Sequence, residues 1–156
     1  MITRIALLMK PQIDIVIEEG ISPELERIEQ IAETIWEEER VQGEYEISIL
    51  FCGDDRMREL NRQYRGCDSV TDVLSFSSKA FDLALGVQGE KWICDIIIDT
   101  KYIQSQKGSN GYTQEIEEVL IHSFLHILGY DHMKTKDKEK METKENYYKQ
   151  LLQGVS

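Results

Sequence analysis

The sequence predicts a single domain in which β-strands and α-helices alternate, and three observations support this prediction. The chain has 156 residues, of which 41% are hydrophobic and 30% charged, and this size and composition suit one compact core. Two segments alternate apolar and polar residues as half-buried strands do. The segment between them repeats apolar residues at helical spacing. We therefore expect residues 1–156 to form one domain that combines both kinds of element.

The first three elements form a strand, helix, strand unit. The segment QIDIVIE, residues 12–18, places its three isoleucines on one face of a strand, and YEISILF, residues 45–51, alternates in the same way. Between them, Ser22 followed by Pro23 is typical of a helix N-terminus. Apolar residues then recur at helical spacing and predict a helix from about residue 23 to residue 41. Both strands should be half-buried.

A second helix is expected directly after this unit. Asp54 can cap its N-terminus, and Met57, Leu60 and Tyr64 are spaced to face inward from it. Gly66 can take the conformation that ends a helix. The sequence therefore predicts a short helix that begins and ends with recognisable capping residues.

Two more strands and two more helices complete the chain. The segments VTDVLSF and WICDIIID are rich in β-branched and apolar residues, which predicts two strands separated by a loop over residues 77–91. A third helix is expected to begin near Thr113 and to run into a group of histidines. The segment KDKEKMETKENYYKQLL predicts a terminal helix.

All three histidines of the chain lie in one segment, HSFLHILGYDH, residues 122–132. At about 100° per residue, apolar residues cover most of the circumference of this helix. His122 and His126 fall in the one polar gap, together with Glu115 and Glu118. Two imidazoles one turn apart on the face of a cleft have the spacing needed to chelate one metal ion.

Gly129 explains the position of the third histidine. A glycine just past a helix can take the left-handed conformation that ends the helix and reverses the chain, which brings His132 back beneath the other two. Three histidine ligands leave one tetrahedral position open, as in catalytic zinc sites. We predict one zinc ion per chain, bound by His122, His126 and His132. The alternative is three unrelated histidines at a solvated helix end.

The same spacing, H-x-x-x-H-x-x-G-x-x-H, occurs in metzincin proteases, but with one difference. In those enzymes a glutamate follows the first histidine and serves as the general base. Ser123 stands at that position here, and a hydroxyl group cannot accept the proton of a water molecule at neutral pH. A peptidase is therefore a minor alternative.

The charge of the chain limits its partners. A net charge of −11 and a pI near 4.7 argue against general affinity for nucleic acids, because phosphate binding needs lysine and arginine. Two segments are locally basic: DDRMRELNRQYRG holds four arginines and HMKTKDKEK holds four lysines. The lysine segment is equally typical of a solvated helix start with alternating charges.

Arg65 has a position and a side chain that suit phosphate binding. It precedes Gly66 at a loop edge, and its planar guanidinium suits two phosphate oxygens. From these residues alone, a surface arginine paired with Asp68 is the more ordinary explanation. Thr71, Asp72 and Ser75 either line a polar cleft beside Arg65 or form the solvent side of a strand.

The sequence shows no sign of export or of membrane insertion. The apolar run near the N-terminus is shorter than that of a signal peptide, and no segment is long and apolar enough to span a bilayer. Cys52, Cys67 and Cys94 are odd in number, widely spaced and without a CxxC pair. We expect a cytoplasmic protein with no membrane partner.

Three sequence blocks resemble one known family, the YbeY endoribonucleases. The family signature is close to HGxLHLxGYDH, which HSFLHILGYDH matches except at Ser123. A family segment like LNxxYRxxDxPTDVLSFP is similar to LNRQYRGCDSVTDVLSF, with Val70 and Ser77 in place of two prolines. A third block, like GDI before apolar residues, stands as CDIII from Cys94. These departures fall on positions that shape the backbone, and the three histidines are unaltered.

The resemblance implies a fold, an activity and a site. The fold would be a single α+β domain with a small mixed sheet packed with helices and a zincin-like metal-binding helix. The zinc ligands would be His122, His126 and His132, and Arg65 would be the catalytic arginine.

The implied activity is that of a zinc-dependent, single-strand-specific endoribonuclease in ribosomal RNA maturation and ribosome quality control. Its partners would be single-stranded ribosomal RNA, the small ribosomal subunit and assembly factors. The alternatives are a non-catalytic ribosome-assembly factor with a structural zinc, and a metal-dependent hydrolase of another substrate.

Overall fold

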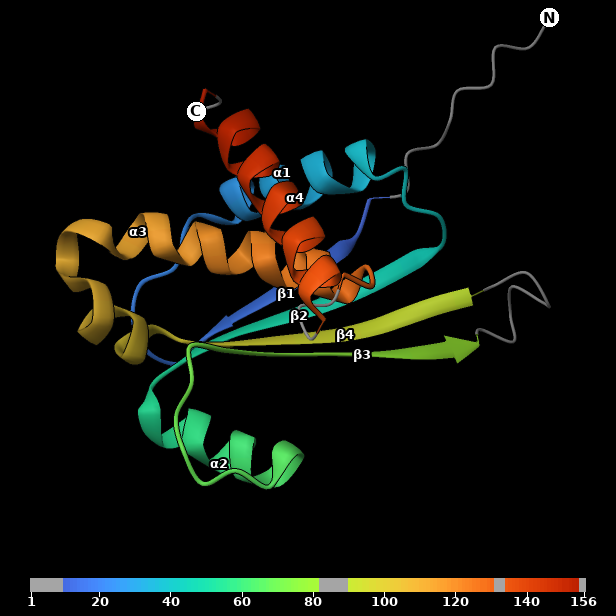
Figure 1. Cartoon of the computed structure of the whole chain (residues 1–156). Helices are drawn as coiled ribbons and strands as arrows, with labels where there is room; N and C mark the ends of the chain where they lie inside the picture. The colour runs from blue at the N-terminus through green and yellow to red at the C-terminus, as the bar shows by residue number, and fades with distance from the viewer. Residues whose placement is uncertain (1–9, 82–89, 131–133, 155–156) are drawn as a thin grey trace, which may run out of the picture.

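The strands form one mixed sheet (Figure 1). The computed structural model of the chain describes residues 10–81, 90–130 and 134–154. The four strands are β1 (Gln12–Ile17), β2 (Glu44–Cys52), β3 (Val73–Phe81) and β4 (Glu90–Asp99). They lie in the order β1-β2-β4-β3, so that β1 and β3 are the edges. β1 and β4 are both parallel to β2, whereas β3 is antiparallel to β4.

Helices cover the two faces of this sheet unequally. The helices are α1 (Leu25–Glu38), α2 (Asp54–Arg65), α3 (Thr100–Ile127) and α4 (Thr135–Gln153). α1, α3 and α4 lie on one face, while α2 lies alone on the other (Figure 1). The expected α+β fold with a small mixed sheet is confirmed.

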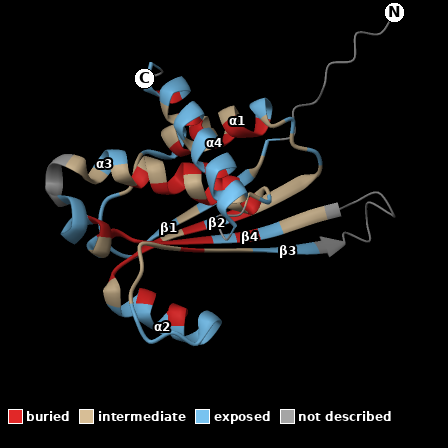
Figure 2. Cartoon of the chain, viewed as in Figure 1, coloured by how far each residue is buried: buried red, intermediate tan, exposed pale blue. Residues whose placement is uncertain are grey.

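The main core lies between the sheet and the three helices (Figure 2). Alternate residues of the two central strands point into it, namely Ile47, Ile49 and Phe51 of β2 and Cys94, Ile96 and Ile98 of β4. α1 contributes Ile28, Ile31, Ala32, Ile35 and Trp36, and α3 contributes most of its apolar face. The strand and helix periodicities read from the sequence therefore meet in one core.

A second, smaller core lies under α2. It consists of Cys52, Met57, Leu60, Leu74 and Ile97, all buried. Side chains alternate between the two faces along a strand, so Ile97 points to this face while its neighbours Ile96 and Ile98 point to the main core. The predicted inward positions of Met57 and Leu60 are confirmed. That of Tyr64 is wrong, because Tyr64 is 58% exposed and its ring packs on Phe76 of the edge strand β3.

The third helix begins earlier than expected. α3 starts at Thr100 and not near Thr113, and it changes direction partway along its length (Figure 1). Asp99 caps it, since its Oδ1 accepts a hydrogen bond from the Tyr102 N–H at 3.0 Å. The segment GSNG, residues 108–111, has low helix propensity and hid this continuity in the sequence.

Four smaller expectations also need correction. The N-cap of α2 is Gly53, without a side-chain cap, and the predicted cap Asp54 is the first helical residue. α1 begins at Leu25 with Glu24 at its N-cap, and the Ser22 hydroxyl donates to the Pro23 carbonyl instead of capping the helix. β3 extends through Phe81, so that residues 77–81 belong to a strand and not to the predicted loop. Ile17, expected to be half-buried, is 52% exposed at the end of the edge strand β1. Within the described ranges, no helix is long and apolar enough to cross a membrane.

Candidate active site

The two helical histidines lie in the last two turns of α3, where a chain reversal follows. Gly129 has φ +105°, and its N–H donates to the His126 carbonyl at 3.0 Å. The Tyr130 N–H donates to the Leu125 carbonyl at 3.1 Å, which completes a Schellman motif. The left-handed Gly129 predicted from the sequence is confirmed. His132, the third predicted ligand, lies outside the described residues.

His122 opens into a pocket of about 220 Å³. The pocket lies between α3, α4 and the start of β3, and its lining residues are Asp72, Val73, Glu115, Glu118, Val119, His122, Glu145 and Lys149. Glu115 and Glu118 thus share a cleft with His122, as their common face of the helix predicted. Asp72 also lines this cleft, and therefore lies beside His122 and not in a polar cleft beside Arg65.

The ring of His122 is held by a carboxylate from α4. Its Nδ1 lies 2.7 Å from Oε1 of Glu145, and the side chains are 35% and 18% exposed respectively. Metal-binding histidines commonly donate one ring N–H to a carboxylate in this way, which leaves the other nitrogen for the metal. The arrangement of His122 therefore fits the predicted zinc ligand.

Ser123 points away from this chemistry. It is fully buried, and its hydroxyl donates to the Val119 carbonyl at 2.8 Å within α3. Its side chain therefore faces the core, and it cannot take the place of the metzincin glutamate.

Among the residues that line the pocket, Glu115 has a carboxyl group with a raised pKa. Burial raises the pKa of the Glu115 carboxyl above its ordinary value, although Lys107 opposes the shift. The neighbouring carboxyl groups of Glu118 and Asp72 raise this pKa further. A carboxyl group whose pKa lies closer to neutrality is suited to proton transfer.

A partly buried carboxylate at the end of α1, that of Glu39, holds the turn that follows the histidine helix. The Tyr130 hydroxyl donates to Oε1 of Glu39 at 2.5 Å, while the Tyr148 hydroxyl and Lys144 donate to Oε2. Burial alone would raise the pKa of the Glu39 carboxyl, but these hydrogen bonds outweigh it and hold the pKa below its ordinary value. Glu39 thereby ties α1 to α4 and to the chain that leads to His132.

Arg65 lies on the other face of the sheet from the histidines. It is an exposed residue in the last turn of α2, and Gly66 ends that helix with φ +69°. The histidine pocket and α2 lie on opposite sides of the edge strand β3. Val73 of this strand lines the histidine pocket. Phe76 of the same strand packs against Tyr64 of α2, with the ring centroids 5.2 Å apart. The structure therefore does not place Arg65 in the histidine pocket.

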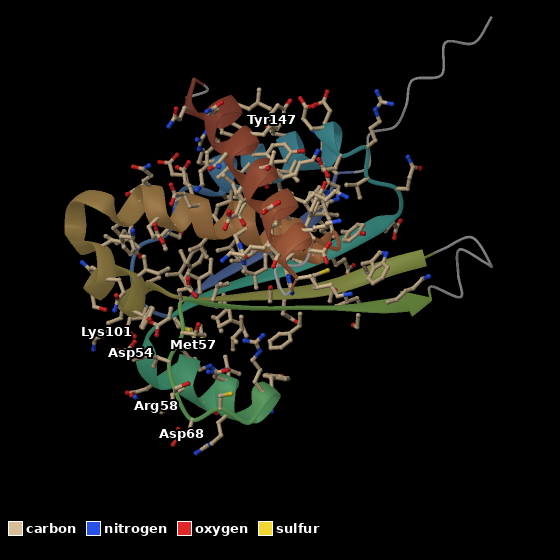
Figure 3. The ribbon with its side chains drawn as sticks, in the orientation of Figure 1. Asp54, Met57, Arg58, Asp68, Lys101 and Tyr147 are labelled. Carbon is tan, nitrogen blue, oxygen red and sulfur yellow. The ribbon has the colours of Figure 1, made fainter. Side chains whose placement is uncertain are left out.

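Arg65 belongs to a basic stripe on α2. Arg58, Arg62 and Arg65 are all exposed, and their spacing of four and three residues places them on one face of the helix. Arg58 and the nearby Asp68 lie on the α2 side of the molecule (Figure 3). Among the described ion pairs, none joins Arg65 to Asp68.

The described residues supply only part of a metal site. Within residues 10–81, 90–130 and 134–154, no group of three or more histidine, cysteine, aspartate and glutamate side chains is arranged to hold a metal ion. His122 and His126 lie one helical turn apart, the spacing that two zinc ligands would need, and of the two His122 lines the pocket. The predicted zinc site stays a prediction, because its third ligand lies outside these residues.

Sequence reasoning missed two residues that shape this region, Glu39 and Glu145. A signal for Glu145 was available, since it follows Met141 by four residues and precedes Tyr148 by three, in the apolar spacing of α4. A glutamate at such a position indicates a buried partner. Glu39 gave no comparable signal, because it ends a run of glutamates that read as solvated.

The fold and the paired histidines define an α+β protein with a histidine-bearing helix packed on a mixed sheet. The sequence model of the family described as Endoribonuclease YbeY matches residues 16–153. The chain therefore belongs to the endoribonuclease YbeY family.

Individual relatives agree with this assignment. The chain is 35% identical over 148 residues to the Endoribonuclease YbeY of Bacillus subtilis strain 168, a match that covers 90% of this chain and 92% of the relative. It is 38% identical over 108 residues to that of Staphylococcus saprophyticus, covering 67% and 71% respectively. The solution structure of TM1509 from Thermotoga maritima is similar, with a TM-score of 0.59, 27% identity, and coverage of 92% of this chain and 89% of that chain.

Proposed function

We propose that this protein is a zinc-dependent endoribonuclease that cleaves single-stranded RNA in ribosomal RNA maturation and ribosome quality control in the cytoplasm. The observation that carries the proposal is the pair of histidines one turn apart, with His122 in a carboxylate-lined pocket, in a member of the endoribonuclease YbeY family. The Bacillus and Staphylococcus relatives carry endoribonuclease as their printed name.

Zinc would be held by His122, His126 and His132. When bound, it supplies a Lewis acid that stabilises the negative charge developing on the phosphodiester. The chain itself supplies the means to move protons, since Glu115, Glu118 and Asp72 share the pocket with His122. Of these, Glu115 is the best suited, because burial and its acidic neighbours raise its pKa.

Arg65 is assigned to RNA binding at a distance from the histidines. RNA is a flexible polymer, and a strand that passes over the edge strand β3 can contact the histidine pocket and α2 together. The three exposed arginines on one face of α2 then meet successive phosphates of the same strand. Arg65 would then contribute mainly to binding, together with Arg58 and Arg62, and not to the chemical step.

A second function, an assembly factor with a structural zinc, is favoured by the charge of the pocket. Four carboxylates, those of Asp72, Glu115, Glu118 and Glu145, line it beside a single lysine, and the chain carries a net charge of −11. Such a pocket repels phosphate unless a cation is present. Enzyme and assembly factor therefore differ in whether the metal-loaded protein cuts RNA.

The test combines metal analysis with a ribonuclease assay on single-stranded ribosomal RNA, with and without a chelator. We expect about one zinc per chain, loss of zinc and cleavage in His126→Ala, and loss of cleavage on chelation. Arg65→Ala should keep its zinc, bind RNA more weakly and cleave at a higher Michaelis constant. Gln63→Ala, on the same helix and also exposed, is the control.

Three results would contradict parts of this proposal. Full zinc occupancy in His126→Ala would remove the zinc assignment. Zinc-loaded protein that binds ribosomal RNA without cutting it would replace the enzyme with the assembly factor. An Arg65→Ala variant with an unchanged Michaelis constant and a slower chemical step would return Arg65 to catalysis.

A further inference from the structure

Glu145 occupies an unusual position for a charged residue. The buried residues of α4 are Met141, Tyr148 and Leu152, and the spacing of four, three and four residues places Glu145 in line with them. Only 18% of its side chain is exposed. A carboxylate on the packed face of a helix is costly unless a donor meets it.

The donor that meets Glu145 is the imidazole of His122. In a neutral imidazole one nitrogen donates a hydrogen bond and the other accepts one. The partner of either nitrogen therefore determines which of the two carries the hydrogen. The 2.7 Å contact joins Oε1 of Glu145 to Nδ1 of His122. Since a carboxylate only accepts hydrogen bonds, a neutral imidazole in this contact carries its hydrogen on Nδ1 and its lone pair on Nε2.

We propose that Glu145 is a positioning residue for the metal site, which fixes the tautomer and the ring orientation of His122 so that Nε2 is the metal-binding nitrogen. This inference rests on the proposed function in one respect, namely that His122 binds zinc. Carboxylates that hold a ligating histidine in this way commonly account for about 10- to 100-fold in metal affinity.

The position of Glu145 is itself fixed by its neighbours on α4. Lys144 Nζ lies 3.0 Å from Oε2 of Glu39, and Tyr148 donates to the same oxygen. At the far end of α4, Arg27 of α1 donates to the Leu152 carbonyl at 3.2 Å. These contacts hold α4 against α1 on both sides of Glu145, so the carboxylate meets the imidazole in one place.

A purely structural tie between α3 and α4 is the competing explanation, and two measurements separate it from positioning. The first is the tautomer of His122 in metal-free protein, read from the ¹⁵N shifts of its ring at a pH where the imidazole is neutral. We expect the Nδ1–H tautomer in the wild type and a mixture in Glu145→Gln. The wild-type spectrum needs no variant to fold.

The second measurement is the zinc dissociation constant, obtained by competition with a chromophoric chelator. Glu145→Gln should weaken zinc binding by about 10- to 100-fold while the unfolding midpoint of the metal-free protein stays close to that of the wild type. Glu142→Gln, on the exposed side of the same helix, is the matched control and should bind zinc as the wild type does.

The outcomes of the two proposals are distinguishable. If the wild type binds no zinc but His122 is locked in the Nδ1–H form, the zinc proposal fails and the fixing of the tautomer by Glu145 stands. If the wild type binds zinc and Glu145→Gln binds it equally well, the positioning role is overturned. A mixture of tautomers in the wild type also overturns it, even if Glu145→Gln does not fold.

Discussion

The two faces of the sheet differ in how much protein covers them. On one face α1, α3 and α4 enclose a large core and hold His122 through a carboxylate that is itself packed in place. On the other face α2 covers a cluster of only five buried residues, and Tyr64 beside it stays 58% exposed. The thinly covered face carries the basic stripe of Arg58, Arg62 and Arg65.

The difference matches the demands of two kinds of site. A metal ligand needs a fixed ring orientation, which requires packing on several sides. Contacts to a polymer backbone need charge and exposure more than fixed geometry. The well-packed face is therefore suited to chemistry and the thinly covered face to binding.

The largest expected difference is between truncating a leucine of the main core and truncating a leucine of the small core under α2. Leu120→Ala, in the fully buried part of α3, should lower the free energy of unfolding by about 3 to 5 kcal/mol, because the surrounding helices cannot collapse into the cavity. Leu60→Ala, under α2, should cost about 2 kcal/mol, because its site is 7% exposed and can relax. Urea unfolding of both variants measures the difference, and equal losses would contradict the contrast.

The Glu39 carboxylate, on the well-packed face, should stabilise the fold through its hydrogen bonds. Glu39→Gln should lower the free energy of unfolding by about 2 kcal/mol at pH 7, because Lys144 and two tyrosine hydroxyls lose a charged acceptor. The pKa of Glu39 is lowered in the folded state, so this stabilisation is present above the ordinary carboxyl pKa and is lost as the pH falls through the folded value. The gap between wild type and variant should therefore close in acid, and a gap independent of pH would argue against the ionised carboxylate.

A second buried carboxyl, Asp99, should have the opposite effect. It lies where β4 runs into α3, and its Oδ2 is buried without a hydrogen-bond partner among the described residues. Burial and the neighbouring carboxyl of Asp54 raise the pKa of Asp99 to about 7. A raised pKa means that its contribution to stability is full below the ordinary aspartate pKa and is lost as the pH rises toward 7.

Asp99→Asn should therefore stabilise the protein at pH 8 by about 1 to 2 kcal/mol and should reduce the fall in stability between about pH 4 and pH 7. The amide oxygen can still accept the Tyr102 N–H that caps α3. Thermal unfolding across this pH range provides the measurement. A variant that is less stable than the wild type at pH 8 would show that Asp99 is needed in its ionised form.

The ends of α1 and α2 allow the smallest and most closely matched comparison. Both helices end in a left-handed residue, Arg40 with φ +52° after α1 and Gly66 with φ +69° after α2. Arg40→Gly should stabilise the protein by about 1 kcal/mol, because a side chain is strained in that conformation. Gly66→Ala should destabilise it by a similar amount, since no neighbouring atom would clash with the added methyl group and only the backbone strain counts. Chemical unfolding of the two variants should give shifts of opposite sign.

Much of the fold was predictable because its signals are local. The alternation of QIDIVIE and YEISILF predicted β1 and β2, and Gly129 predicted the reversal after the histidine helix, where φ is indeed positive. The start of α3 was not predictable in this way. Its first part has weak helix propensity and is fixed by Asp99 at the end of a strand and by the packing of Ile103, which is 2% exposed.

By itself the sequence determined the element types, the one-turn spacing of His122 and His126, and the polar face that they share with Glu115 and Glu118. Each of these depends on residues a few positions apart, where backbone geometry dictates the outcome. Only tertiary packing brings Glu145 to His122 across 23 residues and Glu39 to Tyr130 across 91, and only packing puts α2, which carries Arg65, on the other face of the sheet. These partnerships depend on which face each helix packs against, and the apolar pattern of a helix identifies its buried side but not its neighbour.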